Sequence, residues 1–383
     1  MANPLLELTR SGQSVWYDGF RRGLLASGEL ARHVEEDGLA GLTTNPAIYE
    51  KAIAGSRDYH AELATLLPRR ELDAKAIYEE LALHDIQAAA DLLRPVYERT
   101  ARRDGYVSLE VSPVLARDAG ATLAEARRLW RSLGRENAMI KVPGTPEALP
   151  AIRQLLSEGV NVNVTLLFSR GAYARVAEAH LAALEDRAAR GQDLSRVASV
   201  ASFFVSRVDT LVDGMLESVA AGREADEVRV RAEALRGRVA VANAKLAYQD
   251  WRALTASTRW ARLSALGARP QRLLWASTST KNAHYRDVMY VEELIGADTI
   301  DTMPPATFEA FRDHGRVRPT LEDDVEGARR TMVELAHLGI SIDDVTDRLL
   351  AEGVRLFAEP FAKLLATIEA HRATASGAGA TAP

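Results

Sequence analysis

The sequence predicts an α/β fold, a (β/α)8 TIM barrel with additional helices at its N- and C-terminal ends. Short β-rich segments alternate with longer helical patterns along the whole chain, as expected of repeated βα units around a parallel sheet. Eight such segments are present, and nearly every one ends in polar or ionisable residues. The rival architecture, an open doubly wound sheet, usually has a glycine-rich loop after its first strand, and none follows Asp18. The closed barrel is therefore preferred.

The strands are predicted from short β-branched and apolar runs bounded by turn residues. In chain order they are 14–18, 38–45, 106–111, 138–142, 160–165, 197–204, 272–277 and 299–303. Helices are predicted near 29–36, from Pro46, over 73–100 and 124–133, and through most of 208–266. From 320 to 373 apolar residues recur at helical spacing, so we expect C-terminal helices packed on the outside of the barrel.

Composition indicates an ordinary globular protein. Of 383 residues, 47% are hydrophobic and 26% are charged, so we expect a single barrel domain over 1–375. The tail over 376–383 consists of Ser, Gly, Ala, Thr and Pro, which can bury almost nothing, so we expect it to be disordered. The net charge of −5 provides no general cationic field for nucleic acid or an anionic membrane. The chain has no cysteine, no targeting segment and no apolar run long enough to span a bilayer, so we predict a cytoplasmic protein. The eight histidines show no paired metal-binding spacing, and neither metal nor cofactor is expected.

Lys141 is the most informative of the polar residues at strand ends. Ile140 and Val142 are expected to face the helices, so alternation turns Lys141 into the barrel interior. Burying an ammonium is costly, and the usual escape is loss of the proton, which leaves an amine able to form an imine with a ketone. Only six of the 48 basic residues are lysines, so a lysine retained here calls for a reason. The alternative, a lysine that reaches solvent or merely pairs with Glu110, is about equally compatible with the strand pattern.

Other strand ends carry candidate site residues. Glu110 is either a general acid/base or the counter-ion of Lys141. The fifth strand alternates polar and apolar residues and places Asn161, Asn163 and Thr165 on one face, which favours a wet or ligand-filled interior over a purely structural polar layer. Asp18 either moves protons or caps a turn. Basic residues and hydroxyls after strands six and seven suit a phosphate, because the loops at this end of a barrel commonly bind one.

Five segments carry a resemblance to the transaldolase family, particularly its bacterial branch with a longer chain. They are GLTTNP (41–46), VSLEVSP (107–113), IKVPGT (140–145), NVNVTLLFS (161–169) and FVSRVD (204–209). They follow the family's order, and the resemblance spans about 18–315. It implies a class I aldolase-like barrel whose Schiff-base lysine stands on strand four.

The resemblance implies a reaction and a role for each candidate residue. A dihydroxyacetone unit would pass from sedoheptulose 7-phosphate or fructose 6-phosphate to glyceraldehyde 3-phosphate or erythrose 4-phosphate, in the non-oxidative pentose phosphate pathway and without cofactor. The implied catalytic residues are Lys141 for the imine, Asp18 as acid/base at the carbon–carbon bond, and Glu110 with Thr165 for the water used at the imine. Asn45 and Asn163 would bind substrate hydroxyls. The phosphate would meet Ser202, Arg207, Ser277 and Lys281, with Phe204 lining the site.

Two other functions stay open at this point. One is a lyase of the fructose 6-phosphate aldolase type, although such chains are much shorter. The other is a non-catalytic barrel that binds sugar phosphates, although a binder needs no amine nucleophile. A homodimer is also left open. The chain departs from the longer branch at Ser279 and Thr280, where Gly-Val is more usual, and at Asp301, where Asn is more usual. A carboxylate near the phosphate loop would weaken phosphate binding.

Overall fold

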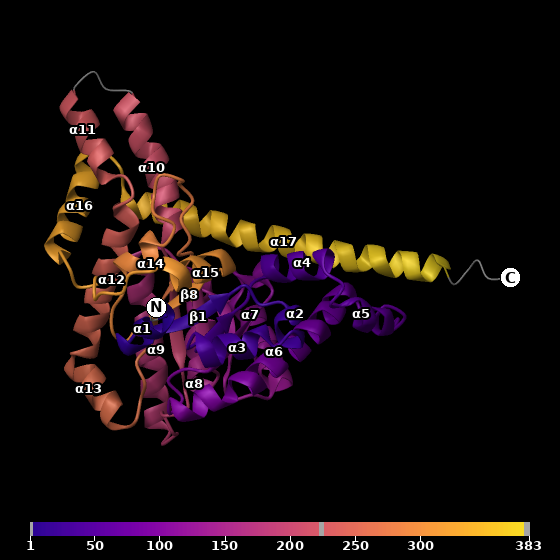
Figure 1. The fold of residues 1–383 in the computed structure, drawn as a ribbon. Coiled ribbons are helices and arrows are strands. Elements are labelled where there is room, and N and C mark those ends of the chain that lie inside the picture. Colours follow the sequence, from indigo (N-terminus) through magenta and orange to yellow (C-terminus); the bar gives the residue numbers. More distant parts are fainter. Residues whose placement is uncertain (1–2, 222–225, 379–383) are drawn as a thin grey trace.

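Eight parallel strands close into a barrel in their chain order in this computed structural model, which describes residues 3–221 and 226–378 (Figure 1). The strands are β1 (Ser14–Asp18), β2 (Gly41–Thr43), β3 (Tyr106–Glu110), β4 (Ala138–Pro143), β5 (Val162–Leu167), β6 (Ser199–Phe204), β7 (Arg272–Ala276) and β8 (Ile300–Met303). Each strand pairs in parallel with the next, and β8 pairs with β1. The predicted closed barrel is confirmed.

Helices precede, separate and follow the strands. Helix α1 (Pro4–Arg10) precedes β1. After β1 and β2 come α2 (Arg22–Ala26), α3 (Glu29–Glu36), α4 (Pro46–Gly55), α5 (His60–Leu66) and α6 (Ala74–Arg99). After β3 to β5 come η1 (Pro113–Leu115), α7 (Ala119–Leu133), η2 (Pro146–Ala148), α8 (Leu149–Glu158) and α9 (Arg170–Ala189). After β6 come α10 (Ser206–Ala221), α11 (Asp226–Leu235), α12 (Val239–Thr255) and α13 (Thr258–Ala265). The last are α14 (Met289–Glu293), α15 (Pro305–His314), α16 (Val325–His337) and α17 (Ile342–Ala378).

Local chemistry explains where the elements differ from the sequence prediction. Helix α7 starts five residues earlier than predicted because the side chain of Asp118 accepts a hydrogen bond from the amide of Ala121 and caps it. Strand β2 is shorter than predicted, since Gly38 has a φ of 71° and Asn45 already caps α4. Strand β5 runs on to Leu167 through a register shift, where Leu166 has a φ of 62°. Such a φ is strained for leucine, and strain of this kind gathers at functional sites.

The amino end of the barrel is closed by a buried ion pair. Arg272 on β7 donates to Asp104 at 3.0 Å and to the carbonyl of Thr299 at 2.8 Å. Asp104 also accepts from Ser14 at 2.7 Å and from the indole of Trp16 at 3.2 Å. These groups therefore tie β1, β7 and the segment before β8 together at the barrel floor.

The long helix α17 crosses the opposite, carboxyl end of the barrel. It packs against α4 and α6 and contacts β5, and in Figure 1 it runs as a yellow rod from behind α10 past α4. Gly353 permits the close crossing, because a Cβ there would lie 3.0 Å from Cδ2 of Leu166. Phe357 is 5% exposed. Of the two C-terminal helices, α16 packs on α12, whereas α17 packs on α4, α6 and α10 and lies across the carboxyl end of the barrel.

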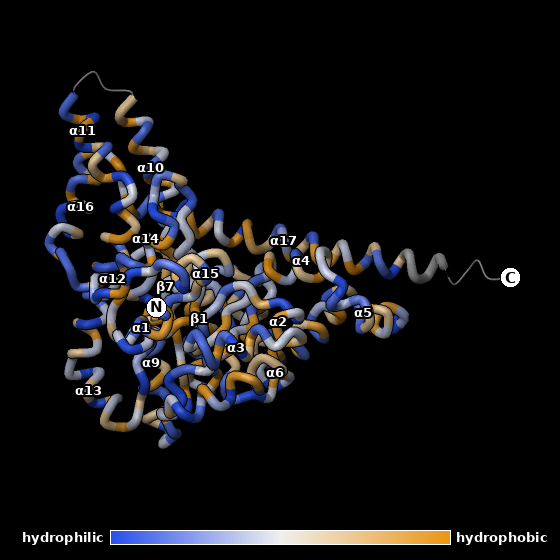
Figure 2. Tube along the Cα trace, in the orientation of Figure 1, coloured by the Kyte–Doolittle hydropathy of each residue, from blue (hydrophilic) through white to orange (hydrophobic). Residues whose placement is uncertain are grey.

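Hydropathy follows this arrangement. Figure 2 shows hydrophilic and hydrophobic residues alternating along α17, as expected for a helix with one buried face. Within the described ranges, no helix combines the length and the apolar character needed to cross a membrane. Of the predicted disordered tail, 376–383, the structure describes only the last turn of α17, through Ala378, and the rest lies outside the described residues.

Candidate active site

Lys141 lies at the carboxyl end of β4 with its side chain inside the barrel. The residue is 4% exposed. Its Nζ donates a hydrogen bond to the carbonyl of Thr44 at 3.0 Å and lies 3.3 Å from Oε2 of Glu110. The ring of Phe357 covers it, with the centroid 5.4 Å from Nζ. Lys141 therefore does not reach solvent, which excludes one of the alternatives left by the sequence. It pairs with Glu110 inside the barrel.

Glu110 stands beside Lys141 because β3 and β4 pair in register at these two residues. Burial raises the pKa of Glu110 to about 7, and the negative charge of Asp18 adds to the rise, whereas Lys141 opposes it. Apart from the ion pair, neither carboxyl oxygen of Glu110 has a hydrogen-bond partner among the described residues. A carboxyl with this pKa and free acceptor positions can take up and return a proton near neutral pH.

Asp18 ends β1 on the other side of the mouth. Its Oδ1 accepts a hydrogen bond from Thr43 at 2.8 Å, and Thr43 in turn meets the hydroxyl of Thr302 at 2.8 Å. Removal from water raises the pKa of Asp18, while the charges of Lys141 and Arg207 and the hydrogen bond from Thr43 lower it. The three strands β1, β2 and β8 therefore hold the Asp18 carboxyl in one orientation, within the electrostatic reach of Lys141.

The polar face of β5 lies next to Lys141. Asn163, fully buried, pairs in register with Lys141, donates to the hydroxyl of Ser108 at 3.1 Å and accepts from Ser202 at 2.7 Å. Thr165 is also fully buried, and its hydroxyl has no hydrogen-bond partner within the described ranges. A buried hydroxyl without a partner is costly, so it is available for a water or a substrate oxygen.

Asn45 faces the same mouth from the start of α4. Its Oδ1 accepts a hydrogen bond from the amide of Ile48 at 3.1 Å and caps the helix. The Nδ2 group is not used in this cap. Asn45 therefore combines a structural role, which the sequence prediction did not include, with a donor that can bind a substrate hydroxyl.

The predicted phosphate-binding residues do not form one cluster. Arg207 stands in the first turn of α10, 5.4 Å over the ring of Phe204. Partial burial lowers the pKa of Lys281, and the positive charge of Arg207 lowers it further, while Nζ of Lys281 donates to the hydroxyl of Ser279 at 2.7 Å. Ser277 contacts the hydroxyl of Ser206 at 3.0 Å. Ser202, by contrast, lies deeper in the barrel on Asn163.

Several residues around the site were given no role by the sequence predictions. Thr43 orients Asp18, Ser206 meets Ser277, and Phe357 covers Lys141. Thr43 and Ser206 lie within the segments that carry the family resemblance, so those segments include them but assign them no role. Phe357 belongs to no motif, and its place over the amine depends on how α17 crosses the barrel.

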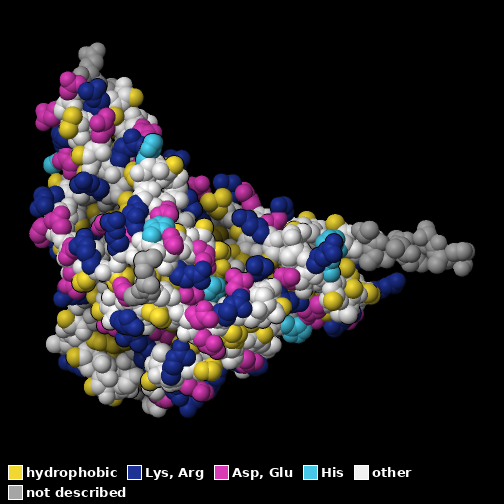
Figure 3. Space-filling view, in the orientation of Figure 1, with side chains coloured by type: hydrophobic (Ala, Val, Ile, Leu, Met, Phe, Trp, Pro, Cys, Tyr) yellow, Lys and Arg dark blue, Asp and Glu magenta, His cyan; other side chains and the backbone are white. Residues whose placement is uncertain are grey.

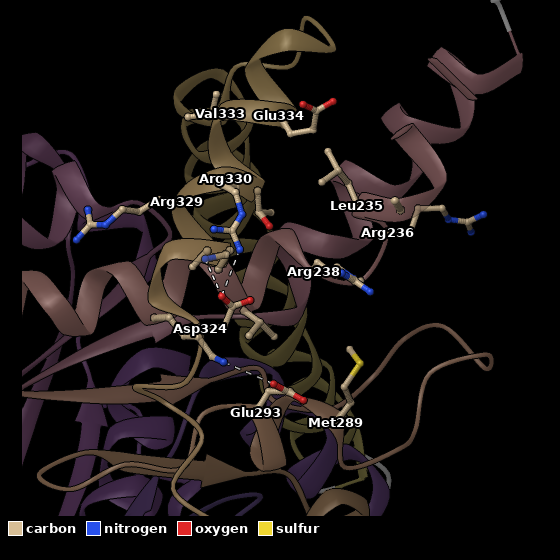
Figure 4. Close-up of a pocket in the computed structure, with 18 of the residues that line it drawn as sticks. Leu235, Arg236, Arg238, Met289, Glu293, Asp324, Arg329, Arg330, Val333 and Glu334 are labelled. Atoms are coloured by element: carbon tan, nitrogen blue, oxygen red, sulfur yellow. Dashed lines mark hydrogen bonds and ion pairs between the residues drawn. The ribbon is translucent and has the colours of Figure 1, made fainter. Parts of the chain in front are cut away.

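A cavity of about 930 Å³ lies away from the barrel mouth, between α12, α16 and the segment around Tyr285 (Figure 4). Two ion pairs form between its lining side chains: Asp324 meets Arg330 at 3.4 Å, and Lys245 meets Glu293 at 3.7 Å. We assign no chemistry to this cavity. Within the described ranges, His, Asp and Glu side chains form no group of three that could hold a metal ion.

Comparison with known proteins shows the family of the chain. The family model described as "Transaldolase/Fructose-6-phosphate aldolase" matches residues 15–368. A transaldolase of Trichodesmium erythraeum is 47% identical over 96% of this chain and 97% of its own length. Transaldolase 2 of Nostoc punctiforme is 49% identical over the same shares, and a transaldolase of Thiobacillus denitrificans is 47% identical over 94% of this chain and 98% of its own. The chain belongs to the transaldolase/fructose-6-phosphate aldolase family.

Proposed function

We propose that this enzyme is a transaldolase of the cytoplasm that moves a dihydroxyacetone unit between sugar phosphates through a Schiff base on Lys141. The donor would be fructose 6-phosphate or sedoheptulose 7-phosphate, and the acceptor erythrose 4-phosphate or glyceraldehyde 3-phosphate. The observation that carries the proposal is the nearly complete burial of the Lys141 amine, 3.3 Å from the Glu110 carboxyl. The reaction as proposed draws only on side chains of this chain and uses no cofactor.

Imine formation is the first step. Glu110 takes a proton from the Lys141 ammonium, and the amine attacks the C2 carbonyl of the ketose phosphate to give a carbinolamine. Glu110 then returns the proton to the carbinolamine hydroxyl, which leaves as water and leaves an iminium ion behind. The unpartnered hydroxyl of Thr165 is available to bind this water. The same groups serve the hydrolysis in reverse.

Carbon–carbon bond cleavage is the second step. The carboxylate of Asp18 takes the proton of the C4 hydroxyl, the C3–C4 bond breaks, and the electron pair moves into the iminium to form an enamine. The aldose phosphate leaves, and the enamine remains on Lys141. An acceptor aldehyde is then attacked by the enamine carbon and receives the proton from Asp18. The hydrogen bond from Thr43 supports this role because it favours the ionised form of Asp18.

Substrate positioning uses the amides and the two cations. Asn163, beside Lys141, and the Nδ2 group of Asn45, which the helix cap does not use, would bind hydroxyls of the three-carbon unit, which must be retained until the acceptor arrives. Arg207 and Lys281 would bind the phosphate, since a dianion bound by both cations would relieve the repulsion that lowers the pKa of Lys281. The ring of Phe204, 6% exposed, would line the path between these two regions.

Borohydride trapping tests the proposal. Incubation with fructose 6-phosphate and borohydride should reduce the imine to a stable secondary amine, and peptide mass analysis should find the adduct on Lys141. Lys141→Arg should show no adduct and no turnover, because a guanidinium is not a usable nucleophile. Lys363, an exposed lysine, pairs with Glu50, and Lys363→Arg is the matched control. This variant should keep both the adduct on Lys141 and the turnover. Full turnover by Lys141→Arg would end the proposal.

The lyase alternative is separated by its dependence on an acceptor. A transaldolase should release little product from fructose 6-phosphate until erythrose 4-phosphate is added. Cleavage at a comparable rate without the acceptor would assign the chain to the lyase side of the family.

A further inference from the structure

Asp301 on β8 is a buried carboxyl that the proposed chemistry does not use. Its neighbour Thr302 meets Thr43 inside the barrel, so alternation turns Asp301 outward, toward the surrounding helices. It is fully buried. Its Oδ1 accepts one hydrogen bond, from the hydroxyl of Thr278 at 2.9 Å, and its Oδ2 has no partner among the described residues. Burying a carboxyl for a single hydrogen bond is unfavourable compared with an apolar residue, so the position calls for an explanation.

Thr278 opens the loop that carries Lys281. The residue before it, Ser277, has a φ of 57°, a left-handed conformation that is unfavourable for serine and persists only where the surroundings hold it. The carbonyl of Ser277 accepts from the amide of Ser206 at 3.0 Å, and the two serine hydroxyls lie 3.0 Å apart. Ser206 precedes Arg207. One side of the loop entrance is therefore fixed by the turn that carries Arg207, and the other side by Asp301.

We propose that Asp301 is a positioning residue for substrate phosphate: through Thr278 it holds the start of the β7 to α14 loop so that Ser277 and Lys281 face Arg207. The proposal rests on the proposed function, which places the phosphate at these residues. It also changes the meaning of Asp301 expected from the sequence, because a fully buried carboxyl bound to Thr278 does not stand in the open mouth as a repelling charge.

A carboxylic acid can hold Thr278 without carrying a charge. Burial raises the pKa of Asp301 to about 8, so the group is mainly protonated at neutral pH, and its carbonyl oxygen still accepts from the hydroxyl. An asparagine offers the same acceptor at the same place. A leucine offers none and leaves the Thr278 hydroxyl buried without a partner. Asp301→Asn is thus the conservative variant, and Asp301→Leu and Thr278→Val are the disruptive ones.

Two ketones separate phosphate binding from imine chemistry. Fructose 6-phosphate and dihydroxyacetone would form the imine at the same lysine, but only the first has a phosphate. The half-saturating concentration of each is measured from the rate of inactivation by borohydride. In Asp301→Leu and in Thr278→Val the value for fructose 6-phosphate should rise about fivefold, which at 1.4 kcal/mol per factor of ten corresponds to about 1 kcal/mol, the usual worth of one hydrogen bond. The value for dihydroxyacetone should stay at the wild-type level in both variants, and Asp301→Asn should keep the wild-type values for both ketones.

Equal losses with both ketones, or an Asp301→Asn variant as impaired as Asp301→Leu, would overturn the proposal and leave Asp301 as a packing residue. Thr278→Val keeps the test decisive if Asp301→Leu does not fold, because it removes only the hydroxyl from the loop side. A wild-type protein that neither ketone can inactivate would refute the proposed function itself, which is a different outcome from selective failure of the variants.

Discussion

Glu110 should set the pH dependence of the reaction. Its pKa of about 7 means that it is protonated below this pH and cannot accept the proton of Lys141, and that it is ionised above. We therefore expect kcat to rise as pH increases through about 7 and then to level off. Glu110→Gln should lower kcat by about 10²- to 10⁴-fold and remove the rise, as for the loss of a general base. The measurement is kcat against pH for both proteins at saturating donor and acceptor.

Thr165→Val is the control for this profile. It removes a hydroxyl beside the same step without changing a titrating group, so its kcat should fall while the pH profile keeps its shape. The same rise in Glu110→Gln as in wild type would show that another group, with Asp18 as the first candidate, governs the pH dependence.

Much of the site at the residue scale follows from strand alternation. Alternation turned Lys141 and Glu110 inward, and the in-register pairing of β3 and β4 then makes them neighbours. Alternation places Asn161 and Asn163 on the same face of the strand and could not show that their roles differ. Asn161 bonds the carbonyls of Glu136 and Ala138 and accepts from the amide of Ala198, so it fastens the starts of strands, whereas Asn163 reaches the mouth. The difference lies in depth along the barrel, which a period of two does not encode.

At the scale of elements, α17 is the part of the fold that the sequence did not place. Its amphipathic pattern predicts one buried face but says nothing of which surface covers it. The outer surface of the barrel and its mouth both offer apolar contacts. The position over the mouth depends on Gly353 passing close to Leu166, a contact between residues far apart in the chain. Patterns of local periodicity carry no information of this kind.

Phe357 tests what α17 does for the site. Phe357→Ala should lower the free energy of unfolding by about 3–5 kcal/mol, as for other large core truncations, and should also lower kcat because water reaches Lys141. Phe361→Ala is a matched control. Phe361 lies one turn further along α17, is 4% exposed and packs on Tyr78 instead of Lys141. Urea unfolding and steady-state kinetics of both variants provide the comparison.

A similar loss of stability with a loss of kcat in Phe357→Ala alone would assign α17 a direct part in covering the amine. Parallel losses of kcat in the two variants would mean that the helix contributes only through packing.

At the scale of the whole molecule, a buried ion pair closes the amino end of the barrel, its floor, and the candidate active site lies at the carboxyl end. The floor depends on Arg272 and Asp104, both nearly inaccessible to water. Asp104→Asn leaves Arg272 buried without its counter-ion and should lower the free energy of unfolding by about 3–5 kcal/mol. The KM of the folded enzyme should not change, because the floor lies at the opposite end from the substrate. Urea unfolding with parallel kinetics measures both quantities.

The surface pair of Arg153 and Asp186 is the control for the floor. These side chains are 51% and 36% exposed, and Asp186→Asn should cost less than about 1 kcal/mol. A loss in Asp104→Asn no larger than this would show that the buried pair adds nothing to stability.

Ion pairs on the surface also explain in part why arginine outnumbers lysine in this chain. Figure 3 shows basic and acidic side chains intermixed over one face. Several arginines bind a carboxylate through two nitrogens, as Arg135 does with Asp91 and Arg170 with Asp250. Lysine cannot make this two-point contact. Arginine therefore supplies most of the positive charge in this chain. Lysine is kept at Lys141, whose proposed chemistry requires a primary amine.

The crossing of α17 has a consequence for protein synthesis. The helix follows all eight strands in the chain, yet it supplies the ring that covers the amine of the fourth. A nascent polypeptide can therefore close its barrel on the ribosome while Lys141 is still not covered by Phe357. Release of the segment around Phe357 from the exit tunnel is the event that completes it, so a translation product stopped before this point would be a barrel with its amine open to water.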